Sequence, residues 1–385
     1  MVILQGNLSP KLHGIGESIF ATMTKLSNEH QALNLSQGFP DFNCPAKLIE
    51  LVNHYMNKGF NQYAPMPGLP RLKEKIAEKT EKVYEAVYDP DKEITITAGA
   101  TQALFTAISA FVKEKDEVII FEPAYDSYLP AILLNKGVPK YVKMSLPDYK
   151  INWSEVKKLI SYKTKMIILN TPHNPTGSIL TENDITELEK IVNNRDIIIL
   201  SDEVYEHIIF DGHRHESITR YPSLRDKSLI ISSFGKTYHT TGWKMGYVVA
   251  PPELTEEFRK IHQFVVFAVN TPIQHAYADF LSNEEHYFEL NEFYQKKRDI
   301  FLEGIQASRF TPIPCSGTYF QCLSYENISE KGDFDFAVEL TEKYKLASIP
   351  VSVFYHSRDD HKVLRFCFAK SEDTLKKAAE ILCKI

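Results

Sequence analysis

The middle of the chain alternates short apolar runs with longer amphipathic stretches. The apolar runs are rich in β-branched side chains and lie at residues 93–97, 117–122, 166–170, 197–202, 229–234 and 246–250. Such runs are typical of strands that are buried on both faces of a sheet. Amphipathic stretches at 99–113, 181–192 and 252–264 predict helices between them. This alternation predicts an α/β fold with a mostly parallel sheet flanked by helices.

The two ends of the chain follow a different pattern. From residue 279 a polar, amphipathic stretch predicts one long helix that ends near residue 308. A strand is predicted at 363–368, and Ser371, which two acidic residues follow, is typical of the N-cap of a final helix at 371–384. At about 150 residues per domain, 385 residues favour more than one domain. We expect a large domain of residues 45–280 and a small α+β domain built from both chain ends, 1–44 and 281–385.

Composition and charge exclude several classes of partner. The chain has 44 basic and 50 acidic side chains and therefore a net charge of −6. It lacks the surplus of basic residues that is typical of nucleic-acid-binding proteins. No apolar run reaches about 18 residues, which indicates no membrane span. The first residues lack the basic region and apolar run of a secretory signal. The 5 scattered cysteines fit neither a disulfide framework nor a metal site. We expect a cytoplasmic protein without a bound metal.

Polar residues follow several predicted strands, where open α/β sheets bind ligands. Gly99, Ala100 and Thr101 open a helix, and small residues at a helix N-terminus suit a phosphate, although such a turn is more often only a turn. Asn174 lies in the segment NPTG, which also fits a rigid loop. Asp202 ends a buried strand, where a carboxylate requires a cation or a donor; a helix N-cap or a structural ion pair would satisfy it equally.

Two lysines and one arginine complete the set of candidate residues. Lys236 and Lys244 follow the run 229–234, and a lysine there can bind phosphate or act as a nucleophilic amine, although most lysines are solvated surface charges. Arg365 lies inside an apolar strand and therefore needs an anion, either a ligand carboxylate or a structural partner. Each residue alone has an ordinary structural explanation, but their order along the chain is specific.

That order resembles the fold-type I pyridoxal-phosphate aminotransferases of class I/II, from about residue 13 to the C-terminus. The motifs that carry the resemblance are NPTG at 174–177, SDEVYEHI at 201–208, SFGKTY at 233–238, GWKMGY at 242–247 and LRFCFAK at 364–370. The resemblance implies the PLP-transferase fold, pyridoxal 5′-phosphate as cofactor, and a ping-pong exchange of an amino group between an amino acid and a 2-oxo acid.

The resemblance also implies a role for each candidate residue in cofactor binding. Lys236 would hold the cofactor as a Schiff base and shuttle the Cα proton of the substrate. Asp202 would keep the pyridine nitrogen protonated, while Tyr205 and Asn174 would donate to the phenolic oxygen of the ring. Tyr125 would stack on the ring face. The phosphate would be held by Ser233, Lys244 and the amides of Gly99, Ala100 and Thr101.

For the substrate, the resemblance implies recognition of both the carboxylate and the side chain. Arg365 would clamp the carboxylate, helped by Asn174 and the backbone of Gly38. Phe20 and Phe267 of the partner subunit would line the side-chain pocket, with Tyr319 as a weaker candidate, although ordinary core packing also explains Phe20 and Phe267. Tyr63 of the partner subunit would reach the phosphate, which implies a homodimer with shared active sites.

Three further segments favour one branch of the family. NLSQGFPDF at 34–42, NQYAPMPG at 61–68 and IPVSVFY at 349–355 are similar to methionine aminotransferases and kynurenine (glutamine) transaminases. His239 looks more like the bacterial methionine-preferring enzymes, and Ala268 stands where kynurenine-type relatives tend to carry a histidine. Overlapping activity on methionine and the aromatic amino acids is expected, because an apolar pocket separates similar side chains by only about 1–3 kcal/mol. The alternatives are a kynurenine/glutamine transaminase, a β-lyase of cysteine S-conjugates and an effector-binding domain of a transcription regulator.

Overall fold

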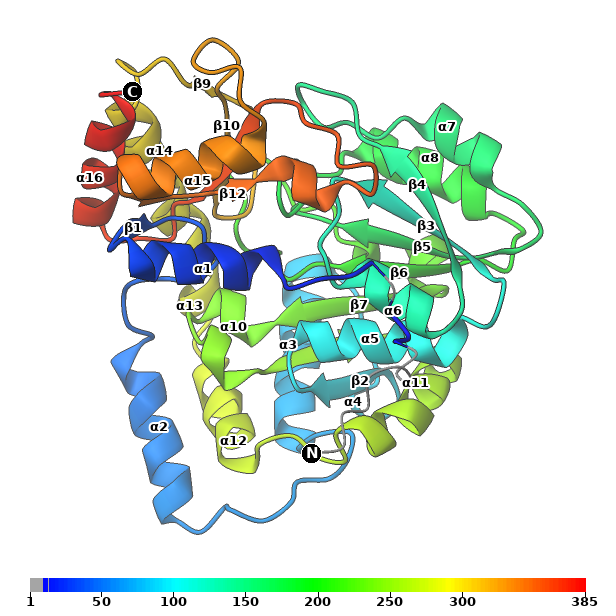
Figure 1. Cartoon of the computed structure of the whole chain (residues 1–385). Helices are drawn as coiled ribbons and strands as arrows, with labels where there is room; N and C mark the ends of the chain where they lie inside the picture. Colours follow the sequence, from blue (N-terminus) through cyan, green and yellow to red (C-terminus); the bar gives the residue numbers. More distant parts are fainter. Residues whose placement is uncertain (1–9, 13) are drawn as a thin grey trace, which may run out of the picture.

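The computed structural model describes residues 10–12 and 14–385, and its centre is a seven-stranded sheet (Figure 1). The strand order is β2-β8-β7-β6-β5-β3-β4. β7, β6, β5, β3 and β4 run parallel, and β8 is antiparallel to both of its neighbours. The bounds are β2 (Ile94–Thr97), β3 (Glu117–Glu122), β4 (Val138–Lys143), β5 (Thr164–Asn170), β6 (Ile198–Asp202), β7 (Ser228–Ser233) and β8 (Gly246–Val249). The predicted mostly parallel sheet is confirmed.

Helices cover both faces of this sheet, as the apolar runs predict. Alternate side chains of a strand point to opposite faces. Ile120, Ile168 and Leu200 therefore pack with α5 (Ala100–Phe111), α6 (Tyr128–Leu134) and α11 (Pro252–Val265). Their neighbours Ile119, Ile167 and Ile199 pack on the other face with α7 (Trp153–Leu159), α8 (Glu182–Val192) and α9 (Pro222–Arg225).

Strand β4 is absent from the sequence prediction, and its position explains why. It lies at the edge of the sheet, so its side chains are mostly half-buried or exposed and its sequence VPKYVK mixes polar and apolar residues. Its proline has no backbone N–H group to donate to a neighbouring strand, which an edge strand tolerates. Strand β4 therefore lacks the continuous apolar run by which the buried strands are identified.

An N-terminal segment packs against the C-terminal part of the chain beside this sheet (Figure 1). β1 (Leu33–Asn34) pairs in parallel with β11 (Leu346–Ala347), and α1 (Ile19–Glu29) packs against α15 (Asp333–Lys343). A second sheet has the order β12-β13-β10-β9, with bounds β9 (Thr311–Pro312), β10 (Phe320–Ser324), β12 (Ile349–Pro350) and β13 (Val363–Cys367). The division into domains at residues 45 and 280 stays a prediction, and residues 1–9 and 13 of its N-terminal piece lie outside the described part.

The single long helix expected at 279–308 is wrong. Three helices occupy this region: α12 (Thr271–Phe280), α13 (Glu285–Phe288) and α14 (Leu290–Gly304). The side chain of Asn283 accepts a hydrogen bond from the amide of Glu285 between the first two of them. Asparagine competes in this way with intrahelical hydrogen bonds, which favours a break between helices. The final helix is confirmed as α16 (Glu372–Leu382), with Ser371 as its N-cap.

In chain order, three of the remaining helices lie between β1 and β2, and one follows β7. They are α2 (Ala46–Asn57), α3 (Pro70–Tyr84), α4 (Pro90–Glu93) and α10 (Phe234–Thr237), with 3₁₀ turns at Ile218–Arg220, Thr241–Trp243 and Val351–Phe354. Among the residues that the structure describes, no helix is long and apolar enough to cross a membrane.

Candidate active site

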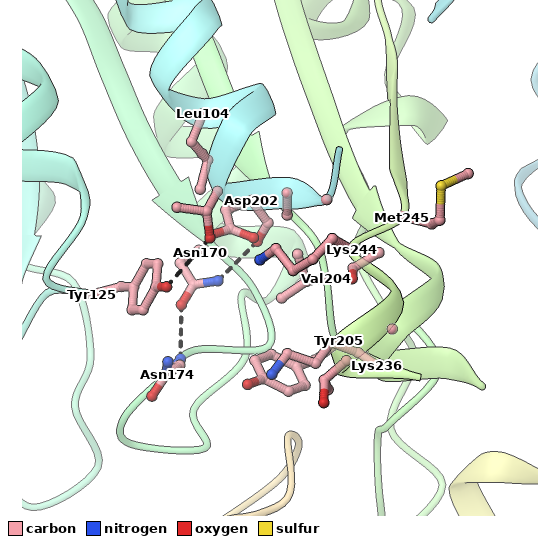
Figure 2. Close-up of a pocket in the computed structure, with 16 residues that line it drawn as sticks. Leu104, Tyr125, Asn170, Asn174, Asp202, Val204, Tyr205, Lys236, Lys244 and Met245 are labelled. Carbon is pink, nitrogen blue, oxygen red and sulfur yellow. Dashed lines mark hydrogen bonds between the residues drawn. The ribbon is translucent and has the colours of Figure 1, made fainter. Parts of the chain in front are cut away.

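A cavity of about 160 Å³ lies at the carboxyl ends of β5, β6 and β7 (Figure 2). Because parallel strands end at one edge of a sheet, Asn170 and Asp202 are direct neighbours in the β5–β6 register. The structure brings ten of the predicted site residues together in the cavity lining: Gly99, Ala100, Thr101, Tyr125, Asn174, Asp202, Tyr205, Ser233, Lys236 and Lys244. Tyr125 and Lys244 enter the cavity from opposite sides (Figure 2).

One end of the cavity suits an anion. Gly99 is the N-cap of α5 and has φ of 80°, a conformation that favours glycine. The first-turn amides of a helix have no intrahelical partner, so those of Ala100 and Thr101 are available at the positive end of the helix dipole. A Cβ atom on Gly99 would come within 3.6 Å of Nζ of Lys244, so this ammonium lies beside the same turn. The arrangement supplies donors and positive charge in one place.

Asp202 lies at the end of β6 with its two carboxylate oxygens in different surroundings. Oδ2 accepts a hydrogen bond from the hydroxyl of Tyr128 at 2.7 Å. Oδ1 is buried and has no hydrogen-bond partner within the described chain. Burial raises the pKa of Asp202 to about 6, although the bond from Tyr128 favours the charged form. A buried acceptor normally has a hydrogen-bond donor, which a ligand in the cavity can supply.

Asn170 connects Asp202 to the NPTG loop. Its side-chain amide donates to the backbone carbonyl of Asp202 at 2.9 Å, and its Oδ1 accepts from the backbone amide of Asn174 at 2.7 Å (Figure 2). A single asparagine therefore fixes the loop relative to the end of the neighbouring strand.

Lys236 lies in the short helix α10, and its amine is buried. Nζ donates to the hydroxyl of Tyr319 at 2.8 Å and to the carbonyl of Gly38 at 3.2 Å. Burial lowers the pKa of Lys236 from its ordinary value to about 8, and the positive charges of Arg365 and Lys244 act in the same direction. About a tenth of this amine is therefore neutral, and hence nucleophilic, at pH 7.

Arg365 is fully buried in β13 and has no carboxylate within ion-pair distance among the described residues. Nη1 donates to Oδ1 of Asn174 at 2.7 Å, and Nη2 donates to the carbonyl of Ser36 at 3.1 Å. Its guanidinium carbon lies 3.9 Å from the ring centre of Phe320 and 5.4 Å from that of Phe20. A cation held only by neutral groups is well suited to a carboxylate ligand.

Tyr63 and Phe267 lie apart from the cavity of their own chain. Tyr63 is 81% exposed and Phe267 is 56% exposed, and their rings meet edge to face with centres 5.1 Å apart. Neither residue lines the cavity. Their predicted contribution to the site of a partner subunit stays a prediction.

The model of the family "Aminotransferase class I and II" matches residues 30–382 of this chain. The chain belongs to this family. It is accordingly a transaminase, and its cofactor is pyridoxal 5′-phosphate. The resemblance recognised from the ordered motifs is confirmed, together with the fold class.

Individual relatives cover nearly the whole of this aminotransferase. A methionine aminotransferase of Escherichia coli is 48% identical over 97% of this chain and 97% of its own length. A kynurenine–oxoglutarate transaminase of Dictyostelium discoideum is 34% identical over 98% and 96% of the two chains. An Escherichia coli structure that identifies a methionine aminotransferase function has a TM-score of 0.96 at 46% identity and covers 98% of this chain and 99% of that one.

The residues of this aminotransferase fit the cofactor. The unpartnered Oδ1 of Asp202 can accept from a protonated ring nitrogen, and the anion site at Gly99 and Lys244 suits a phosphate. The neutral fraction of Lys236 suits attack on an aldehyde. The donor set therefore offers an acceptor, an anion site and an amine around one cavity.

Four contacts of this site escape prediction from sequence. Tyr128 and Asn170 each contact Asp202, Ser36 contacts Arg365, and Tyr319 contacts Lys236 instead of serving only as a pocket wall. Asn170 ends a predicted strand directly before the NPTG loop, a signal that could have been used. Ser36 lies in the segment 34–42, but nothing in that segment indicates a contact with Arg365, and only the fold brings Ser36, Tyr128 and Tyr319 to the site.

Proposed function

We propose that this aminotransferase moves the amino group of methionine, and of aromatic amino acids, to a 2-oxo acid by a ping-pong mechanism. The observation that supports this preference most strongly is the 48% identity over 97% of the chain to a methionine aminotransferase. The surroundings of Arg365 support it as well, because Phe20 and Phe354 both lie within 5.4 Å of the guanidinium carbon. Aromatic rings at this place favour an uncharged, apolar substrate side chain.

In this proposal the chain's own residues divide the work around the cofactor. When bound, pyridoxal 5′-phosphate supplies an electron sink for the substrate carbon. Lys236 holds the cofactor and transfers the Cα proton through Nζ. Asp202 keeps a proton on the ring nitrogen, while Tyr205 and Asn174 donate to the ring oxygen and Tyr125 covers the ring face. The phosphate is bound by Ser233, Lys244 and the amides of Gly99, Ala100 and Thr101.

Substrate recognition in this proposal rests on Arg365. The guanidinium donates to both oxygens of the carboxylate, and it also donates to Oδ1 of Asn174 at 2.7 Å. The cavity lining contains the cations Lys236 and Lys244, and Arg365 lies outside that lining in β13.

We further propose a homodimer with shared sites. Tyr63 and Phe267 expose large aromatic surfaces next to each other, and isolated apolar patches of this kind are typical of protein contacts. In the dimer, Tyr63 of the partner subunit reaches the phosphate and the partner's Phe267 completes the side-chain pocket. A twofold axis would place each pair at the other subunit's cavity.

The second candidate is a kynurenine/glutamine transaminase with β-lyase side activity on cysteine S-conjugates. Relatives named kynurenine–oxoglutarate transaminase, at 32–34% identity, favour it. The decisive experiment measures kcat/KM for a panel of amino donors against several 2-oxo acids. Methionine should lead the panel, with the aromatic amino acids within about 100-fold. A lead by kynurenine or glutamine, or release of pyruvate from S-conjugates as the main reaction, would contradict the proposal.

A further inference from the structure

Lys236, Tyr319 and Gly38 form a closed triangle of hydrogen bonds. Nζ of Lys236 donates to the hydroxyl oxygen of Tyr319 at 2.8 Å and to the carbonyl oxygen of Gly38 at 3.2 Å. The hydroxyl of Tyr319 donates its own proton to the same carbonyl at 2.5 Å. The three residues come from α10, from the segment that precedes β10 and from the segment between β1 and α2, so only the folded chain creates this triangle.

Both acceptors of the triangle are held in fixed positions. Tyr319 is fully buried, and its ring lies edge-on to the ring of Tyr205 with centres 5.1 Å apart. A Cβ atom on Gly38 would come within 2.8 Å of the ring of Phe320, so this backbone lies directly against a buried aromatic side chain. Because the one hydroxyl proton of Tyr319 goes to Gly38, the free lone pairs of its oxygen face Lys236.

This arrangement sets the direction of the lysine's lone pair. A neutral amine has two N–H donors and one lone pair at the corners of a tetrahedron. When Tyr319 and Gly38 receive the two donors, the lone pair points away from both of them. Neither residue lines the cavity, whereas Lys236 does, together with Asp202 and Asn174. The lone pair therefore faces this cavity, in which the cofactor would hold the substrate.

The amine also has a suitable protonation state. Burial lowers the pKa of Lys236 to about 8, so a useful fraction is neutral near pH 7. Burial raises the pKa of Tyr319 well above its ordinary value, so its hydroxyl keeps its proton over the whole working range. The other titratable or charged groups beside the amine are Tyr205, whose ring centre lies 5.5 Å from Nζ, and Cys367, Arg365, Lys244 and Asp202.

We propose that Tyr319 is a positioning residue for proton transfer by Lys236, acting with the carbonyl of Gly38 to aim the amine at the Cα–H bond of the bound amino acid. In this step the Cα–H bond breaks, an N–H bond forms on Nζ, and the electron pair stays with the substrate. The resulting ammonium keeps its two bonds to Tyr319 and Gly38 and carries the new proton on the cavity side, ready for return. The inference rests on the role proposed above for Lys236.

The test compares Tyr319→Phe with Tyr294→Phe. Tyr294 packs on Tyr319 with ring centres 5.6 Å apart, but its hydroxyl pairs with Nδ1 of His239 at 3.0 Å and not with Lys236. Each variant thus removes one buried hydroxyl from the same aromatic cluster. The first readout is the exchange of the methionine α-proton for deuterium in D₂O without a 2-oxo acid, which NMR detects. The kcat and KM of each variant for transamination are measured alongside. The second uses cofactor-free protein and follows the pH dependence of its rate of pyridoxal phosphate uptake.

We expect Tyr319→Phe to slow α-proton exchange and kcat by about 10- to 100-fold with KM changed less than about threefold, since orientation of a catalytic group has effects of this size. The inflection of the uptake profile should move to lower pH, because the lost oxygen no longer stabilises the ammonium. Tyr294→Phe should match the wild type in both readouts. Exchange within about twofold of wild type in Tyr319→Phe, an unmoved inflection, or equal losses in both variants would overturn the inference. If the wild-type protein exchanges the α-proton of none of the amino acids tested, the proposed function is overturned, and this inference is overturned with it.

Discussion

The hydroxyl of Tyr128 donates a 2.7 Å hydrogen bond to one carboxylate oxygen of Asp202, and the other oxygen has no partner among the residues that the structure describes. Tyr128 lies at the start of α6 and Asp202 at the end of β6, so the pair joins a covering helix to the carboxyl edge of the sheet. The bond orients the carboxylate and stabilises its charged form, which opposes the effect of burial on its pKa. Tyr128 thus prepares Asp202 for a cationic ligand group.

Replacing Tyr128 with phenylalanine should lower kcat by about 10-fold, because a hydrogen bond to a charged group contributes about 1.5–3 kcal/mol. The pKa of Asp202 should rise above its value of about 6, so the acid-side loss of activity should move to higher pH. The measurement is kcat between pH 5 and 8. Tyr88→Phe, which also removes a buried hydroxyl, is the control. Superimposable profiles of Tyr128→Phe and wild type would refute this role.

Uptake of pyridoxal phosphate by cofactor-free protein should accelerate as the pH rises through about 8. The neutral amine is the reactive form, and burial lowers the pKa of Lys236 to about 8. Stopped-flow absorbance at several pH values gives the profile directly. An inflection near 10.5, the ordinary lysine value, would show that the amine is not perturbed. Lys236→Ala should show no covalent uptake at any pH.

Arg365→Lys should lower kcat/KM for methionine by about 30-fold or more while leaving cofactor retention nearly unchanged. Lysine keeps the charge but loses the bidentate fork, and truncating one partner of a buried charge pair costs about 2–5 kcal/mol. Steady-state kinetics and the absorbance of bound cofactor after dialysis separate the two effects. Equal losses of turnover and of cofactor would indicate a structural role for this arginine.

Mixed dimers test the shared site. Lys236→Ala and Tyr63→Ala should each be nearly inactive alone. If Tyr63 of the partner subunit serves the site that contains Lys236, a mixed dimer holds one site with both native residues. Equal mixing with subunit exchange should therefore restore about one quarter of wild-type activity. No recovery, although mass spectrometry detects the mixed dimer, would contradict sharing through Tyr63.

The buried pair Lys79–Glu206 should contribute strongly to stability. The two side chains are each 5% exposed and 2.6 Å apart, and Tyr84 and Tyr247 also donate to Glu206. Burial alone would raise the pKa of Glu206, but Lys79 outweighs it and holds the pKa below its ordinary value. Lys79→Met should lower the free energy of unfolding by about 3–5 kcal/mol, measured by denaturant titration.

The surface pair Lys47–Glu50 provides the matched control. Both of its side chains are 67% exposed, and Lys47→Met should change the free energy of unfolding by less than about 1 kcal/mol. A similar change in the two variants would show that burial of the pair adds nothing.

The sheet could be predicted from sequence where its strands are buried on both faces. The predicted bounds of β3 are correct, and those of β5 to β8 agree within two residues, because continuous apolar runs such as EVIIFE mark these strands. The edge strand β4 could not be predicted, because its partial exposure leaves no continuous apolar run. The break before α13 could not be predicted either, because the side-chain hydrogen bond of Asn283 that favours it leaves no periodic pattern.

By itself, the sequence determined the family, the layered fold and the residues at the strand ends, since motifs such as SFGKTY place Lys236 directly after a buried strand. The tertiary structure decided the surroundings that give those residues their properties. Tyr128 lies 74 positions from Asp202 and Tyr319 lies 83 positions from Lys236, so both contacts depend on how helices and sheets pack. Burial and such distant hydrogen bonds shift pKa values and fix orientation, and neither leaves a local pattern in the chain.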